Sequence, residues 1–221
     1  MRLQIVLVAG LCALAAGCGS GSKSIPTGTD GAVVFRDSLA DNHNGWIDIP
    51  QDPHRNGRWD WNDVPRNSVE MADPDALHHA KLPAAVSVGV NVEMRHGAAL
   101  RVISCHEYGT PSTVEGTYEL GIDGRRALIR ELKLNNPPRV LAAQPLPVAN
   151  GRRARLVARC VPDGDAVALS LLVDGKVVAQ ARAAHPLPAG IVGLHAVARP
   201  DSAGPADLTW DDFIVRNAAR S

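Results

Sequence analysis

The sequence predicts an all-β protein, an antiparallel sandwich of two sheets. Apolar and polar residues alternate with a period of two along several segments, which is the pattern of a strand with one buried face. The pairs Asp123-Gly124 and Asp174-Gly175 divide such segments, and this dipeptide favours tight hairpins. No helical periodicity follows the first 17 residues. Many short strands separated by Gly, Pro and Asp turns therefore favour packed antiparallel sheets.

Residues 1–17 are typical of an export signal. Arg2 supplies a short positive region, and Ile5–Ala16 form an apolar run that is too short for a comfortable transmembrane helix. Small residues close the run directly before Cys18. This end resembles the lipobox of bacterial lipoproteins, in which the cysteine is acylated, although Ala15 stands where Leu is usual. The resemblance implies an exported lipoprotein, held on the outer face of the cell membrane by lipid on Cys18. An ordinary secretory signal is the alternative.

Residues 18–32 are rich in Gly, Ser and Thr and predict a flexible tether. Residues 33–217 form the predicted sandwich domain, and residues 218–221 form a short tail. A chain of 221 residues with 45% hydrophobic residues can build one such core. Lys plus Arg and Asp plus Glu both number 23, so there is no basic excess and we expect no nucleic-acid partner.

Cysteine usage predicts one disulfide. Cys12 leaves with the signal and Cys18 carries the lipid, so Cys105 and Cys160 remain as an even pair in an oxidising compartment. Both fall on the apolar faces of their predicted strands. We therefore expect a buried disulfide, with two free buried thiols as the alternative.

Alternation places the other strands in order after the first regular one, Val86–Met94. The later predicted strands are ALRVISCHEY, TYELGID, RRALIRELKL, RARLVARCV, AVALSLLV, KVVAQARA, GIVGLHAVA and DLTWDDFIVRN. The stretch 41–79 is less regular and predicts long loops with short strands over one end of the sandwich. In the last strand, alternation puts Trp210 and Phe213 on opposite faces although both favour burial, so the register there stays open.

The order of several motifs resembles the concanavalin A-like superfamily, in the branch of laminin-G-like domains and the family of unknown function 1080. The motifs span residues 33–217 and are Phe35, Asp37, Gly45-Trp46, Val173-Asp174-Gly175, Gly190–Leu194 and Asp211–Val215. The two cysteines resemble those of exported actinobacterial members. The resemblance implies a jelly-roll sandwich, and it leaves function open because this fold hosts lectins, glucanases, lyases and adhesion modules.

No catalytic motif is found in the sequence. The paired-carboxylate strand pattern of the superfamily's glucanases is absent, as are G-x-S-x-G, HExxH and C-x-x-C. His78-His79 would point to opposite faces of a strand, and we interpret them as a polar loop. Laminin-G-like folds often hold Ca²⁺ in loops such as Asp41–Gly45, but an Asx-rich turn explains this stretch better. We therefore expect no cofactor or metal site, with Ca²⁺ as the alternative.

Polar residues opposite the predicted core face could form the floor of a binding site. They are Asn91, Glu93, Ser104, His106, Glu119, Arg155 and Arg159. Aromatic walls, on which the apolar faces of sugars could stack, would come from Trp59, Trp61 or Tyr108. The alternatives are a solvated sheet face with cross-strand ion pairs and tryptophans packed in the core.

Three functions follow from these observations. The first is non-catalytic binding of a carbohydrate or another cell-envelope ligand. The second, implied by the resemblance, is a hydrolase or lyase of keto-disaccharide type, with Glu93, His106 and Glu119 as acid–base candidates. The third is a structural or accessory lipoprotein. A concave cleft with a close carboxylate–histidine pair and a raised carboxylate pKa would favour the enzyme. An open groove with exposed Trp would favour binding, and a flat charged face with buried Trp would favour the structural role.

Overall fold

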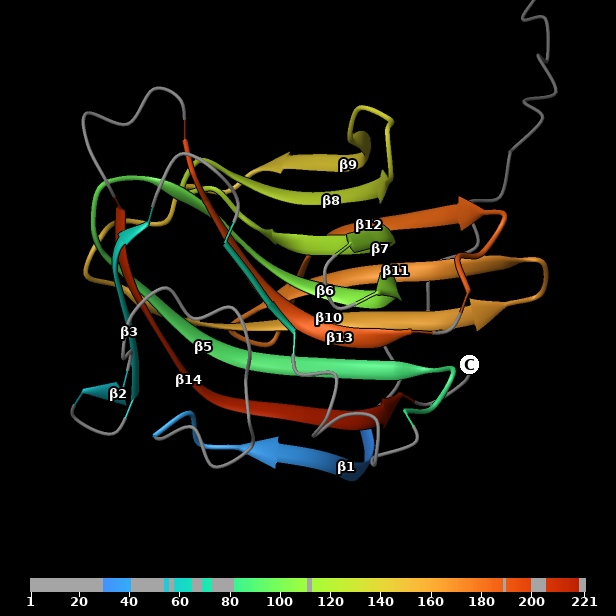
Figure 1. Ribbon diagram of the computed structural model, residues 1–221, viewed down its shortest axis with the longest axis horizontal. Coiled ribbons are helices and arrows are strands. Elements are labelled where there is room, and N and C mark those ends of the chain that lie inside the picture. Colours follow the sequence, from blue (N-terminus) through green and yellow to red (C-terminus); the bar gives the residue numbers. More distant parts are fainter. Residues whose placement is uncertain are drawn as a thin grey trace, which may run out of the picture.

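The computed structural model is built from two antiparallel sheets packed face to face (Figure 1). It describes residues 30–40, 54–55, 58–64, 69–72, 82–110, 113–188, 190–199 and 206–218. All regular elements in these ranges are strands, which confirms the predicted sandwich. No helix that could cross a bilayer occurs in the described part of the chain.

The larger sheet has eight strands, in the order β12-β11-β10-β5-β14-β3-β2, with β1 also pairing with β14. Its strands are β1 (Asp30–Asp37), β2 (His54–Arg55), β3 (Arg58–Val64), β5 (Val86–His96), β10 (Arg153–Asp163), β11 (Ala166–Val173), β12 (Lys176–Ala184) and β14 (Ala206–Ala218). Strands far apart in the sequence therefore lie side by side, as in a jelly roll.

The smaller sheet has six strands, in the order β4-β13-β6-β7-β8-β9. Its strands are β4 (Val69–Ala72), β6 (Ala99–Thr110), β7 (Thr113–Ile122), β8 (Arg126–Lys133), β9 (Arg139–Pro145) and β13 (Ile191–Ala198). The predicted hairpins are present. Asp174 and Gly175, with φ of 50° and 78°, join β11 to β12, and positive φ at both central residues is the geometry that favours Asp-Gly.

The core lies between the two sheets. Val86–Met94 presents its alternate apolar side chains to the core, where each is at most 2% exposed. Cys105 on β6 and Cys160 on β10 form a disulfide across the two sheets, and both are fully buried. The predicted buried face and the predicted disulfide are both confirmed.

A β-bulge in β14 settles the register that the sequence left open. The pairing of β14 with β5 shifts between Asp211 and Ile214, and Asp212 has a φ of 52°. The extra residue lets Trp210 and Phe213 face the same core although their spacing is odd, and both are fully buried. Phe213 also packs edge to face on Phe35, with ring centroids 6.1 Å apart.

Candidate functional site

The predicted binding residues do not form one floor. Four of them, Asn91, Glu93, Arg155 and Arg159, belong to β5 and β10 of the eight-stranded sheet. Ser104 and Glu119 belong to β6 and β7 of the six-stranded sheet. The outer faces of these sheets lie on opposite sides of the sandwich, so the prediction of a single polar floor is wrong.

The aromatic candidates are placed only in part. Trp59 and Trp61 lie in β3, where they pair in register with Trp210 and Leu208 of β14. The structure describes the backbone of Trp59 and Trp61 but not their side chains. Tyr108 is partly buried and packs against the core cluster. Tyr108 is therefore poorly placed to form the wall of an open groove.

The outer face of the eight-stranded sheet carries a network of ion pairs around the bulge in β14. Asp211 accepts a hydrogen bond from Asn91 at 2.6 Å and pairs with Arg153. Asp212 pairs with Arg155 at 3.0 Å, and Arg155 also donates to the carbonyl oxygen of Asp212 at 2.7 Å. The polar groups of this face are thus largely satisfied by one another, as in a solvated sheet face.

Two further candidates on this sheet differ in exposure. Arg159 is only 3% exposed and lies 3.3 Å from Asp30, so it offers little surface to a ligand. Glu93 is half-buried and pairs in register with Arg153 and Thr209.

A second bulge, in β6, reverses the predicted direction of His106. The pairing of β6 with β7 shifts between Cys105 and Tyr108, and His106 has a φ of 56°. The His106 ring lies 6.2 Å from the ring of Tyr118, a core residue, so its predicted outward orientation is wrong. Burial lowers the pKa of His106, and the nearby backbone groups of Ala84 and Leu187 offset this only in part.

The same bulge brings Glu107 into a group that we call the His195 cluster, formed by Ser104, Glu107, Glu119, Arg130 and His195. Ser104 Oγ donates to Glu107 Oε2 at 2.7 Å. His195 Nε2 lies 3.0 Å from Glu107 Oε2, and Nδ1 lies 3.3 Å from Glu119 Oε1. Arg130 Nε donates to Glu119 Oε2. Four adjacent strands, β13, β6, β7 and β8, therefore meet in one network on the outer side of the six-stranded sheet.

Burial makes the cluster a closed set of charges. Ser104, Glu107, Glu119 and His195 are each at most 5% exposed. Burial alone lowers the pKa of His195, but its hydrogen bonds to Glu107 and Glu119 raise that pKa to about 10. Burial is the largest single influence and would raise the pKa of each carboxyl. The hydrogen bond and charge of His195, together with Ser104 at Glu107 and Arg130 at Glu119, outweigh burial, so both pKa values are lowered. Two ionised carboxylates are thus balanced by His195 and Arg130, and neither carboxyl is protonated near neutral pH to act as a general acid.

Sequence reasoning missed Glu107 and His195. A signal for His195 was present, because it alternates with Val192 and Leu194 in a predicted strand and must therefore face away from the core. Glu107 carried no such signal, since simple alternation places it on the core face.

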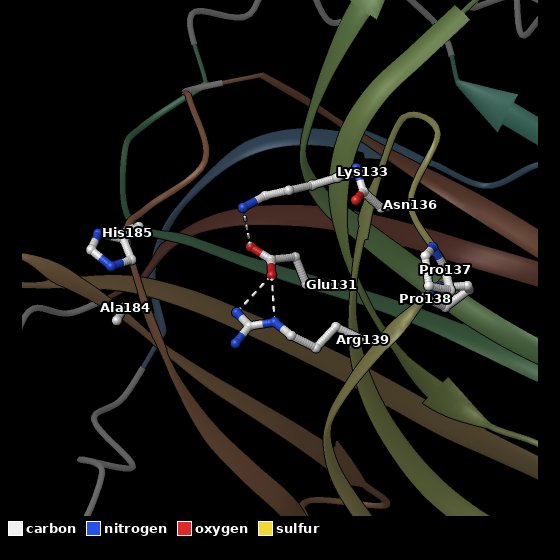
Figure 2. Close-up of a pocket in the computed structure, with 8 residues that line it drawn as sticks. All are labelled: Glu131, Lys133, Asn136, Pro137, Pro138, Arg139, Ala184 and His185. Carbon is white, nitrogen blue, oxygen red and sulfur yellow. Dashed lines mark hydrogen bonds and ion pairs between the residues drawn. The ribbon is translucent and has the colours of Figure 1, made fainter.

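An open pocket of about 680 Å³ lies where the edge strands of the two sheets come together (Figure 2). We call it the edge pocket, and none of its residues was predicted from the sequence. Its lining comes from the end of β8, the turn into β9 and the end of β12, and consists of Glu131, Lys133, Asn136, Pro137, Pro138, Arg139, Ala184 and His185.

Glu131 organises the charges of the edge pocket. It is only 4% exposed, and its Oε2 accepts from Arg139 Nε at 2.8 Å and lies 2.6 Å from Nη2. Its Oε1 lies 3.2 Å from Lys133 Nζ. Lys133 and Arg139 are themselves exposed, so the pocket combines a buried carboxylate with two accessible cations. Figure 2 shows Glu131 between these two side chains.

The described residues contain no group of three or more His, Cys, Asp or Glu side chains that could hold a metal ion. The Asp41–Gly45 loop, considered for Ca²⁺, and His78-His79 lie outside the described residues.

Comparison with known proteins defines the fold. No protein family and no curated protein matches the sequence. A carbohydrate-binding module from Bacillus subtilis superposes with a TM-score of 0.54 at 12% identity, over 86% of this chain and 97% of its own. The Emp47p carbohydrate recognition domain gives 0.56 at 13%, over 86% and 98%. A GlcNAcα1-4Gal releasing endo-β-galactosidase from Clostridium perfringens gives 0.53 at 11%, over 82% and 62%.

This chain shares the two-sheet sandwich fold of these structures, so the expected jelly-roll fold is confirmed. At this level of identity the likeness is one of fold.

Proposed function

We propose that this protein is a non-catalytic carbohydrate-binding domain that recognises its glycan at the edge pocket. The observation that carries the proposal is the pocket itself, because it is open, of ligand size and lined by hydrogen-bonding side chains. The carbohydrate-binding modules among its structural neighbours support sugar as the ligand class by analogy of fold.

The lining of the pocket suits a sugar. Lys133, Arg139 and Asn136 supply polar groups for hydroxyl and ring oxygens. The rings of Pro137 and Pro138 supply apolar surface, against which the C–H face of a sugar ring can pack. Figure 2 places these prolines on one side of the pocket and His185 on the other, so a ligand between them would meet both kinds of surface.

The outer sheet faces support this function less well. Ser104, His106, Glu119 and Arg159 are each at most 7% exposed, so a ligand could reach them only after rearrangement. A ligand at Asn91 and Arg155 would have to break their bonds with Asp211 and Asp212.

A hydrolase or lyase acting on a sugar derivative is the second candidate. The close contacts of His195 with Glu107 and Glu119 favour it. The burial of these groups opposes it, because a substrate could reach them only after rearrangement. The lowered pKa values of both carboxyls also leave neither of them a proton to give as a general acid. The ion-paired outer face around Asp211 and the buried Trp210 would also suit a structural lipoprotein.

Glycan-array binding of the purified protein tests the proposal. Asn136→Ala and His185→Ala should each weaken binding by about tenfold, because both side chains line the pocket. Arg36→Ala, an exposed change on β1 outside the pocket, is the matched control and should leave affinity unchanged. Binding to no glycan would overturn the proposal. Loss of binding only in Trp59→Ala or Trp61→Ala would move the site to β3.

We further propose that the protein is exported and anchored to the outer face of the cell membrane by lipid on Cys18. The proposal rests on the signal-like residues 1–17 and the small residues before Cys18. Cys18→Ser should release the protein from the membrane fraction and abolish labelling by a fatty acid, while Cys12→Ser should do neither. Membrane retention of the Cys18→Ser protein would contradict the anchor.

A further inference from the structure

We infer that the edge pocket selects glycans that carry a carboxylate, such as uronate-containing sugars. This inference rests on the proposed function, because it names the ligand class of the same pocket. It is argued from the balance of hydrogen-bond donors and acceptors around Glu131.

Glu131, the one carboxylate among the described residues of the pocket, is closed to a ligand. It is 4% exposed, and its Oε2 faces two nitrogens of Arg139. Its Oε1 lies 3.2 Å from Lys133 Nζ and accepts no hydrogen bond, but this atom is itself buried. A ligand hydroxyl that approached Glu131 would have to displace one of these cations. Hydroxyl donors of a ligand therefore find no open carboxylate here.

The N–H donors of Lys133 and Arg139, in contrast, outnumber their contacts with the carboxylate oxygens of Glu131. Arg139 uses Nε and Nη2 on Glu131, which leaves Nη1 and the outer hydrogen of Nη2. Lys133 Nζ carries three hydrogens and faces one carboxylate oxygen. In the described part of the chain no second acceptor contacts either group. Both side chains are about half exposed, at 58% for Arg139 and 44% for Lys133, so these donors are open to a ligand.

The charge of the pocket has the same sign as its donor excess. Two cations, Lys133 and Arg139, line it against one carboxylate, Glu131, and no other acidic side chain among the described residues lines it. A group that only accepts hydrogen bonds and is negative matches both properties, and a planar carboxylate fits the guanidinium fork of Arg139. Because the site stands open to solvent, salt should weaken the attraction.

Neighbouring residues can hold the rest of the sugar. Asn136 Nδ2 donates to the carbonyl oxygen of Leu134 at 2.9 Å, so its Oδ1 can accept from a ligand hydroxyl. His185, on the opposite side of the pocket from Pro137 and Pro138, adds a ring N–H donor (Figure 2). The carboxylate of the ligand would lie over Lys133 and Arg139, with its hydroxyls toward Asn136.

The test is an array in which each carboxylated glycan stands beside its methyl ester, together with neutral and sulfated glycans, followed by calorimetry on the best ligand. We expect at least tenfold tighter binding to the carboxylated form than to its ester, with a lower affinity at high salt. Equal binding to acid and ester, or binding to neutral glycans alone, would overturn this inference and leave the proposed function standing. Equal binding to sulfated glycans would make the pocket a general anion site and would also overturn it. Binding to no glycan would overturn the proposed function itself.

Variants locate the effect in the pocket. Lys133→Gln leaves Arg139 on Glu131, and it should weaken binding of the carboxylated glycan about tenfold while the ester changes less than twofold. Arg139→Lys keeps the charge but loses the fork, and it should give an intermediate loss. Arg152→Gln is the matched control, because Arg152 is 52% exposed and paired with Asp174 outside the pocket.

Thermal unfolding of each variant separates lost binding from lost folding. An equal loss of acid and ester binding in a folded Lys133→Gln protein would show that the pocket does not recognise the ligand charge.

Discussion

The outer faces of the two sheets use the same chemistry at different depths. On the eight-stranded sheet, Asp211 and Asp212 pair with arginines while their own side chains are 15% and 38% exposed. On the six-stranded sheet, Glu107, Glu119 and His195 make contacts of 3.0 and 3.3 Å with side chains at most 6% exposed. The contact geometry is similar, so the surroundings decide what each set contributes to stability.

Burial changes the energetics of these contacts. Exposed pairs gain little because water and salt screen them and because long side chains lose freedom. In the His195 cluster, each charge has lost its water and depends on its partners, so the removal of one partner leaves an uncompensated charge. The exposed face can therefore tolerate change at single positions, whereas the buried cluster cannot.

The largest expected effect comes from breaking the buried cluster. His195→Gln removes the cation between Glu107 and Glu119, and it should lower the free energy of unfolding by about 3–5 kcal/mol. Denaturant unfolding followed by tryptophan fluorescence measures this change. A loss below about 1 kcal/mol would indicate that water reaches the two carboxylates. Arg36→Ala, on the exposed face, is the control.

The pH dependence of stability is the second and smaller effect. The pKa of His195 rises on folding from 6.5 to about 10, so its contribution is fully present below pH 6.5 and is lost as pH rises through about 10. The pKa values of Glu107 and Glu119 fall below 4.5 on folding, so their contribution is present above pH 4.5 and is lost as pH falls through the lowered values. Stability should be highest between pH 4.5 and pH 6.5, where both contributions are complete. It should then drop by a few kcal/mol, roughly, as the pH rises toward 10.

The His195→Gln protein checks this assignment. Its unfolding free energy should lack most of the alkaline decline, whereas His185→Gln should keep it, because His185 lies in the edge pocket, outside the cluster. An unchanged decline in His195→Gln would assign the pH dependence to other groups.

Local patterns predicted most of the fold. Alternation in Val86–Met94 and the Asp174-Gly175 turn depend only on near neighbours in the sequence, and both appear as expected. The pairing of the two cysteines was also predictable, because both lie on apolar strand faces. The sheet order was not, since it depends on contacts between strands far apart in the chain.

The site was harder to predict because bulges interrupt alternation. Beyond the bulge at His106, the expected faces of His106 and Glu107 are exchanged, and the His195 cluster depends on that exchange. The edge pocket was missed for another reason. Glu131 and Arg139 come from two strands, and His185 comes from the opposite sheet, so no single segment of sequence carries the pattern.

The smallest expected effect completes the comparison of the two faces. A double-mutant cycle of Arg153→Ala and Asp211→Ala should give a coupling of about 0.2–1 kcal/mol, because Arg153 is 59% exposed. The same cycle with His195→Gln and Glu107→Gln should give a clearly larger coupling, since both partners are buried. Chemical denaturation of the four proteins in each cycle measures both values. Equal couplings would mean that burial does not distinguish the two faces, and the exposed network would then be as rigid as the buried one.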